Sequence, residues 1–141
     1  MTIERILQGR RQVVTCSVTT TVREAAAVLA EKRIGAMPVM DGTAIAGIFS
    51  ERDVIYQLHQ RGAEVLDRPV GDVMTAPAVT VEPDTAAMTA LAMMTKRRIR
   101  HLPVVVGAEM IGFVSIGDIV KYRLDKVEHE AAALRDYIQM A

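Results

Sequence analysis

Serine and aspartate recur at the same spacing at two places in the chain. The segments GIFSERD (47–53) and GFVSIGD (112–118) share the pattern Gly-x-x-Ser-x-x-Asp. A carboxylate placed there can accept hydrogen bonds from both hydroxyls of a ribose, and a helix that begins at the serine offers amide hydrogens to an anion. The preceding glycine would let a ligand approach the backbone. The same Ser–Asp spacing is also a capping box, so a purely structural role stays open.

Basic residues precede an apolar run in RRIRHLPVV (97–105). Arg100 and His101 lie where a helix should give way to a strand, and both side chains can donate hydrogen bonds to phosphate. The similar segment KRIGAMPVM (32–40) carries Gly35 and Ala36 at these positions, so the fold does not require the basic groups. This favours a binding role. The alternative is a solvated basic turn at the end of a helix.

Both pairs of similar segments belong to one internal repeat of the chain. A shift of 65 residues aligns 14–56 with 79–121 without a gap, and 13 of the 43 aligned pairs are identical. Each copy is too small to bury a core alone, which predicts that the two share a sheet-to-sheet interface about a pseudo-twofold axis. The expected fold class is α+β.

Each copy predicts the order strand, helix, strand, strand, helix. The expected strands are 13–18, 36–40 and 45–49 in the first copy and 78–83, 101–106 and 110–114 in the second. The first helix should run from a cap at Thr21 to a stop at Gly35, and its counterpart should cover 88–98. Gly42 and Gly107 should form the hairpin turns. The segments 3–8 and 70–77 are expected to serve as the lead-in of the repeat that follows each.

The last helix should continue well beyond the second repeat. Its apolar residues fall at alternating spacings of four and three, at Val120, Leu124, Val127, Ala131, Leu134 and Ile138. This heptad seam is flanked by charged residues, and a stripe so narrow favours self-association or a partner helix. The alternative is that the helix lies back on its own domain.

Composition narrows the classes of function. Lys and Arg together equal Asp and Glu at 17 each, so no net positive field is available to hold nucleic acid. Half the residues are hydrophobic and there is no Trp, which predicts an aliphatic core. No segment approaches the length of a membrane span and the first residues lack the apolar run of a signal peptide, so we expect a cytoplasmic protein.

Catalysis has little support in the sequence. His59, His101 and His129 are far apart, and the single Cys16 has no recognisable base beside it. Met93 and Met94 fall on a predicted helix and are expected in the core. We therefore expect neither enzyme activity nor a metal.

The two copies resemble a pair of CBS domains, a tandem often called a Bateman module. The resemblance is carried by RHLPVV and GFVSIGD together with the duplication, and it covers nearly the whole chain. It implies a stand-alone regulatory module of two βαββα units, with a first repeat at 1–66, a second at 67–122 and a helical extension at 123–141.

The resemblance also implies ligands and partners. Similar proteins bind adenine-containing ligands, here AMP first, with ATP, ADP, NAD(H) or S-adenosylmethionine as further possibilities, and they commonly form homodimers. An unidentified regulated protein is a further expected partner. The rival hypothesis is a ligand-independent interaction module that acts through the terminal helix.

Two clefts follow from carrying the family's roles over to matching positions. In the main cleft Asp118 and Ser115 would hold ribose and Arg100 and His101 the phosphate, while groups near Val14, Ile34 and Ala36 would enclose adenine. In the second cleft Ser50 and Asp53 match the ribose positions, Val79 and Ile99 the adenine side, and Arg52 could reach in. Because Gly35 and Ala36 supply no phosphate donor, the two clefts are expected to be inequivalent: the second should bind more weakly, take a different ligand or be empty.

Overall fold

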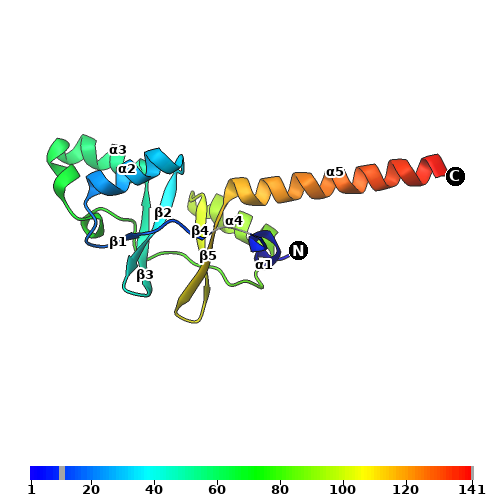
Figure 1. Ribbon diagram of the computed structural model, residues 1–141, viewed down its shortest axis with the longest axis horizontal. Helices are drawn as coiled ribbons and strands as arrows, with labels where there is room; N and C mark the ends of the chain where they lie inside the picture. Colours follow the sequence, from blue (N-terminus) through cyan, green and yellow to red (C-terminus); the bar gives the residue numbers. More distant parts are fainter. Residues whose placement is uncertain (10–11, 141) are drawn as a thin grey trace.

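The computed structural model describes residues 1–9 and 12–140 as two similar units side by side, followed by one long helix (Figure 1). The first unit contains β1 (Cys16–Ser17), α2 (Val22–Lys32), β2 (Ala36–Asp41), β3 (Ala44–Ser50) and α3 (Glu51–Arg61). The second contains α4 (Ala87–Arg97), β4 (His101–Val106), β5 (Glu109–Ser115) and the start of α5 (Ile116–Met140). A short helix α1 (Ile3–Leu7) precedes them, and two 3₁₀ turns, η1 (Ala63–Asp67) and η2 (Val70–Asp72), join them. The expected α+β repeat fold is confirmed.

The two sheets have the same register. In the first, β2 pairs with β3 in antiparallel fashion and β1 adds a short parallel edge. In the second, β4 and β5 pair alike, and a single bridge from Val81 to Val104 takes the place of the edge strand. Gly42 and Gly107 form the hairpin turns with positive φ, as predicted. The strands β3 and β5 bring the two sheets into contact at the centre of the molecule.

The ends of α2 and α4 differ from the prediction in an informative way. The first helix ends at Lys32 rather than at Gly35, because Arg33 adopts a left-handed conformation with φ 53°. Its counterpart Arg98 ends α4 with φ 55°. In both cases the amide of the next residue donates to a carbonyl of the helix, 3.1 Å for Ile34 and 3.0 Å for Ile99. Left-handed backbone is unfavourable for a residue with a side chain and often marks a functional constraint.

The lead-in segments are exchanged between the repeats, which corrects the expectation that each belongs to the repeat after it. Ile3 and Ile6 of α1 are buried in the core of the second repeat, around Leu102, Val114 and Ile119. The junction residues are likewise buried in the core of the first repeat: Val65, Val70 and Val73 pack around Met37, Val39 and Phe49. Each half therefore completes the core of the other. Burial of Met94 in one of these cores confirms its predicted structural role.

The motif glycines make room for these exchanged segments and not for a ligand. A Cβ on Gly47 would come within 2.7 Å of the Thr75 carbonyl, and a Cβ on Gly112 would come within 2.7 Å of a Leu7 methyl group. Neither glycine lines the hollows described below. The expectation that they admit a ligand to the backbone is thus wrong.

Helix α5 leaves the body of the molecule after its first turns (Figure 1). Ile119 is buried, and Ile116 and Tyr122 pack against the second core. Beyond them the helix continues to Met140 with its apolar seam exposed, Leu124 and Leu134 at 57% and 60%. The alternative that this helix folds back on its own domain is therefore wrong.

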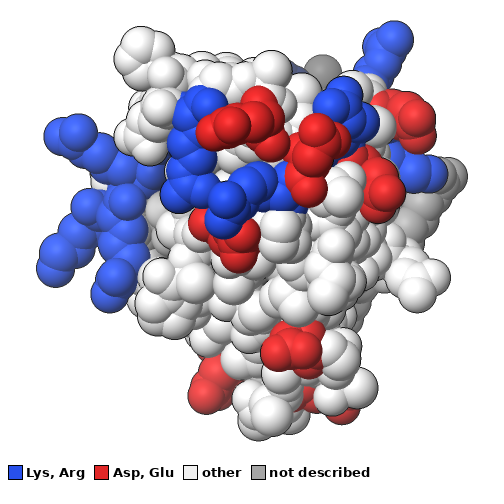
Figure 2. All heavy atoms as spheres, turned by 90° about the vertical axis from the view of Figure 1, so that its left-hand side faces the viewer, with Lys and Arg blue, Asp and Glu red and all other residues white. Residues whose placement is uncertain are grey.

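Charges of both signs share the end of the molecule that carries α2 and α3. Figure 2 shows acidic and basic side chains mixed over its upper half, with basic groups projecting at one edge. Arg23 pairs with Asp67 at 3.2 Å and Arg68 with Asp72 at 2.9 Å. This face is therefore not the uniformly positive surface that a nucleic-acid backbone requires.

Candidate ligand-binding site

Both Ser–Asp pairs form capping boxes. At α3 the backbone N–H of Ser50 donates to Oδ2 of Asp53 at 2.9 Å, and the backbone N–H of Asp53 donates to Oγ of Ser50 at 3.3 Å. At α5 the equivalent bonds between Ser115 and Asp118 measure 2.8 and 3.1 Å. The capping boxes that the Ser–Asp spacing predicted are therefore confirmed. They do not exclude a ligand, because the boxes also hold the carboxylates rigidly at the edges of two hollows.

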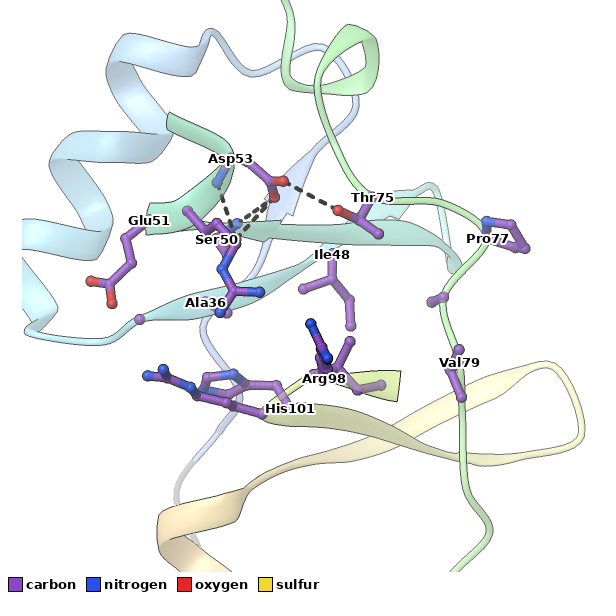
Figure 3. Close-up of a pocket in the computed structure, with 15 residues that line it drawn as sticks. Ala36, Ile48, Ser50, Glu51, Asp53, Thr75, Pro77, Val79, Arg98 and His101 are labelled. Atoms are coloured by element: carbon purple, nitrogen blue, oxygen red, sulfur yellow. Dashed lines mark hydrogen bonds between the residues drawn. The ribbon is translucent and has the colours of Figure 1, made fainter. Parts of the chain in front are cut away.

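The first hollow, which we call the Asp53 cavity, lies between the two repeats and encloses about 240 Å³. That volume is just below the usual range of about 300–1,000 Å³ for small-molecule sites. Its walls come from the strand end and helix start of the first repeat, the junction, and the corner before β4: Gly35, Ala36, Ile48, Ser50, Glu51, Arg52, Asp53, Thr75, Pro77, Ala78, Val79, Arg98, Ile99, Arg100 and His101. Figure 3 shows Ser50, Asp53 and Thr75 on one side, with Arg98 and His101 facing them from the other.

All five residues predicted for the second cleft line this cavity: Ser50, Arg52, Asp53, Val79 and Ile99. The structure adds Thr75, whose hydroxyl donates to Oδ1 of Asp53 at 3.2 Å (Figure 3). Thr75 is 22 residues from Asp53 and has no counterpart in the repeat alignment, so no sequence pattern pointed to it. The hydroxyl occupies a position that a ligand hydroxyl could take as a donor to the same oxygen.

The cationic groups gather in this cavity, which differs from the prediction. The sequence placed Arg100 with Ser115 and Asp118, but Arg100 and Arg98 line the Asp53 cavity, where Arg52 lies at the start of α3. The corner between α4 and β4 is bonded within its own repeat, since the amide of Ile116 donates to the Arg100 carbonyl at 2.8 Å. Arg100 nevertheless lines the cavity at the helix start of the first repeat.

The second hollow, which we call the Asp118 hollow, measures about 450 Å³ and lies at the equivalent place. It contains six of the seven residues predicted for the main cleft: Val14, Ile34, Ala36, His101, Ser115 and Asp118. The seventh, Arg100, is not part of its lining. Arg33 is there instead, in the left-handed corner after α2. The signal for Arg33 was present in the sequence, since it is identical to its repeat partner Arg98.

His101 forms part of the wall between the two hollows and lines both. Its ring stacks on Phe113 with centroids 5.3 Å apart and planes at 14°. Burial lowers the pKa of His101 below its ordinary value of 6.5; Asp118 and Glu51 oppose this shift and Arg100 adds to it. Without a ligand the imidazole is therefore held toward its neutral form. An anion in either hollow would favour the protonated form.

Gly35 opens the space beside this histidine. A Cβ at this position would lie 3.8 Å from Cε1 of His101 and 3.6 Å from Oε1 of Glu51. Gly35 also lines both hollows. Gly35 thus brings the backbone of the first repeat close to both Glu51 and His101.

Other candidate chemistry is weakly supported. Burial raises the pKa of the Cys16 thiol to about 11, which makes it a poor nucleophile near neutral pH. Within 1–9 and 12–140, no group of three His, Cys, Asp or Glu side chains could hold a metal ion. In the same residues no helix is both long and apolar enough to cross a membrane.

The fold is a tandem of two similar α+β units with two hollows at pseudo-equivalent places. The chain belongs to the CBS domain family, which matches residues 3–60 and 70–125. It is 36% identical over 129 residues to the mitochondrial CBS domain-containing protein CBSX3 of Arabidopsis thaliana; the match covers 88% of this chain and 63% of that relative.

Solved structures show the same fold. A CBS-domain containing protein from Agrobacterium tumefaciens is 34% identical with a TM-score of 0.83, over 87% of this chain and 99% of that one. A structure of CBSX2 in complex with AMP is 25% identical with a TM-score of 0.76, over 88% and 96% of the two chains. This chain is thus a CBS-domain pair, a module of the regulatory type.

Proposed function

We propose that this protein is a non-catalytic regulatory module that binds an adenine nucleotide in the Asp53 cavity, with AMP as the first candidate. The observation that carries the proposal is one hollow between the repeats that combines a fixed carboxylate, apolar walls and several cationic groups. The AMP bound to the CBSX2 relative supports this class of ligand. ATP, ADP, NAD(H) and S-adenosylmethionine remain candidates that binding experiments must separate.

Each part of a nucleotide has a matching wall in this proposal. Asp53 accepts hydrogen bonds from the ribose hydroxyls, and its Oδ1 exchanges the Thr75 hydroxyl for one of them. The adenine ring lies against Val79 and Ile99. Arg98, Arg100 and His101 donate to the phosphate from the second repeat, while Arg52 and the first amides of α3 lie on the opposite side.

The two left-handed arginines fit this assignment. Arg33 and Arg98 hold an unfavourable backbone conformation at equivalent corners, and each lines one hollow. The retention of the strain at both sites is consistent with a role for these corners in presenting a cation to a ligand. The Asp118 hollow, with Arg33 as its arginine, is proposed to bind a less phosphorylated ligand more weakly.

Regulation follows from the position of the cavity. A nucleotide in it contacts both repeats, so it favours the relative orientation of the repeats that binds it better. The size of the effect is limited by the difference in affinity between the two orientations. We propose that this change in the relative orientation of the repeats is transmitted to the partner subunit of a homodimer and to a regulated protein. The exposed apolar residues Ile55 and Tyr56 on α3, at 63% and 58%, support such contacts. The cytoplasmic location stays a prediction.

The rival function is a ligand-independent interaction module. The exposed seam of α5 favours it, because an apolar stripe without a partner would otherwise remain in water. The two hypotheses differ in a cheap observation. The chain has no Trp, so nucleotide that copurifies with it would be visible as excess absorbance near 260 nm.

Calorimetric titration tests the proposal directly. AMP, ATP, NADH and S-adenosylmethionine are titrated into ligand-stripped protein, into Asp53→Ala and into Asp118→Ala. The two variants lose matched capping boxes, so their losses of fold stability should be similar, about 1 kcal/mol each. We expect Asp53→Ala to weaken AMP about 100-fold, as two charge-assisted hydrogen bonds are lost, and Asp118→Ala to change AMP affinity little. Equal losses in both variants, or no binding of any of the four ligands, would refute the assignment.

A further inference from the structure

We propose that the α5 helices of two copies of this chain pair in parallel and in register through the heptad seam. The proposal deepens the homodimer suggested above by naming its surface and orientation, and it does not depend on nucleotide binding. It rests on three observations: the seam is exposed, it faces away from the body, and the charges beside it are complementary only in some arrangements.

The seam is a continuous apolar stripe that the rest of the chain leaves in water. Its five large apolar side chains are each 45–63% exposed: Val120, Leu124, Val127, Leu134 and Ile138. From Val120 to Ile138 the stripe extends roughly 27 Å at 1.5 Å per residue. Isolated exposed apolar residues are ordinary, whereas a stripe repeated every three and four residues is typical of a coiled coil.

The seam does not face the body of its own protein. The face of α5 that meets the second core is formed by Ile116, Ile119 and Tyr122. Val120, the first seam residue, follows Ile119 directly and is therefore turned by about 100° around the helix axis. A second helix can reach the seam without displacing the contacts that hold α5 to its repeat.

Charges beside the seam select the arrangement of the partner. With Leu124, Ala131 and Ile138 at the a positions, Arg123 and Glu130 occupy g, and Glu128 and Arg135 occupy e. In a parallel pair each g residue faces the e residue five positions later in the partner helix. Arg123 then faces the partner's Glu128, and Glu130 faces the partner's Arg135. All four contacts in the symmetric dimer are attractive.

Other pairings of the same helix use these charges less well. A fully overlapping antiparallel pair would bring Glu128 against the same residue of the second copy, and Glu130 likewise, so that like charges oppose each other. An antiparallel pair staggered toward the N-terminus would leave Arg135 without an opposite charge. One staggered toward the C-terminus would pair Glu128 with Arg135 but leave Arg123 and Glu130 without an opposite charge. Within a single helix, Arg123, Glu128 and Arg135 have no opposite charge three or four residues away. Among the described residues none of these three takes part in an ion pair.

A charge exchange tests the pairing in the full-length protein. Arg135→Glu places two glutamates opposite each other in the parallel homodimer, and Glu130→Arg places two arginines there. We expect each variant alone to dissociate about tenfold more readily than the wild type by sedimentation, since attraction is replaced by repulsion at two contacts. An equimolar mixture of the two variants should recover wild-type affinity as a heterodimer. Asp136→Lys reverses a neighbouring charge on the outer face and should change nothing.

Cysteine crosslinking tests the orientation independently. In a Cys16→Ser background, Leu134→Cys should form a disulfide-linked dimer under mild oxidation, because position 134 meets its own copy only in the parallel register. Ala133→Cys, one residue away from the seam, should not. Absence of the 134 crosslink in a protein that remains dimeric would overturn the proposal.

The outcomes separate this inference from the proposed function. If the wild type is a dimer and neither charge variant weakens it, the α5 pairing is wrong while a dimer through another surface stands. A protein concentration of about 100 µM lies well above the dissociation constant of a typical specific dimer. If the wild type is a monomer at that concentration, both the pairing and the homodimer are wrong. Nucleotide titration remains a separate test in either case.

Discussion

The Asp53 cavity and the Asp118 hollow occupy equivalent places and differ mainly in charge. Each combines the helix start of one repeat with the corner of the other. The first repeat has Arg52 at its helix start where the second has Gly117, and the second has Arg100 at its corner where the first has Gly35. Because the elements cross between repeats, both added cations fall in the same cavity. Small differences between two copies thus become a large difference between two sites.

Among residues 1–9 and 12–140, His101 is the only basic residue that lines both hollows. It replaces Ala36 at the equivalent corner, and it lines both hollows. The shared wall means that the two sites are not electrically independent, since an anion on one side alters the protonation of a group that the other side also meets. Substitutions at several positions should therefore affect the two hollows differently.

The greatest change should come from the two glycines against which the exchanged segments pack. Gly47→Ala should lower the free energy of unfolding by about 3 kcal/mol, because its Cβ would meet the Thr75 carbonyl, which is backbone and cannot move away easily. Gly112→Ala should cost only about 1 kcal/mol, since the obstacle is a methyl group of the flexible Leu7 side chain. Denaturant unfolding of both variants measures the difference. Equal losses of unfolding free energy in the two variants would contradict the expected difference between the backbone contact at Gly47 and the side-chain contact at Gly112.

A smaller effect is expected from the corner arginines. Arg100→Ala should weaken AMP about tenfold through the loss of a charge-assisted hydrogen bond to phosphate, and should leave adenosine binding nearly unchanged. Arg33→Ala removes an arginine that lines the other hollow; it serves as the control and should not affect AMP binding at the Asp53 cavity. Titration of both ligands into both variants provides the measurement. Equal loss of AMP and adenosine would contradict the phosphate role of Arg100.

The smallest effect is a dependence on pH through His101. Burial lowers the pKa of this imidazole, so the unfolded chain binds the proton more readily and stability should fall as the pH drops through about 6.5. A bound phosphate favours the protonated imidazole, so the affinity for AMP should rise as the pH falls, although stability decreases. AMP should therefore bind about threefold more tightly at about pH 6 than at about pH 7.5.

The control for this pH effect is His101→Gln. The phosphate of AMP has a second pKa of about 6 and titrates in the same range, so part of any change belongs to the ligand. The variant retains that part and loses the contribution of the imidazole. Identical pH profiles for wild type and His101→Gln would exclude His101 from phosphate binding.

Several elements could be predicted from local signals alone. The hairpin turns at Gly42 and Gly107 and the caps at Ser50 and Ser115 depend on residues within a few positions of each other. The stop of the first helix was misplaced because Gly35 is the usual residue for a left-handed corner, whereas Arg33 adopts that conformation here. All five residues predicted for the second cleft line the Asp53 cavity and six of the seven predicted for the main cleft line the Asp118 hollow, because the family's roles carry over to matching positions. Other lining residues, such as Thr75 and Arg98, come from packing between distant segments.

The duplication, the Ser–Asp caps, the apolar seam of α5 and the order of helices and strands, apart from the strand expected at 78–83, could be predicted from the amino-acid sequence because they depend on residue spacing along the chain. Long-range packing alone determines that α1 completes the second core, that the junction completes the first, and that Arg100 lines the cavity of Asp53. The physical reason is that neither repeat can bury enough apolar surface alone. Each therefore takes elements from the other, and long-range packing determines which side chains share a cavity.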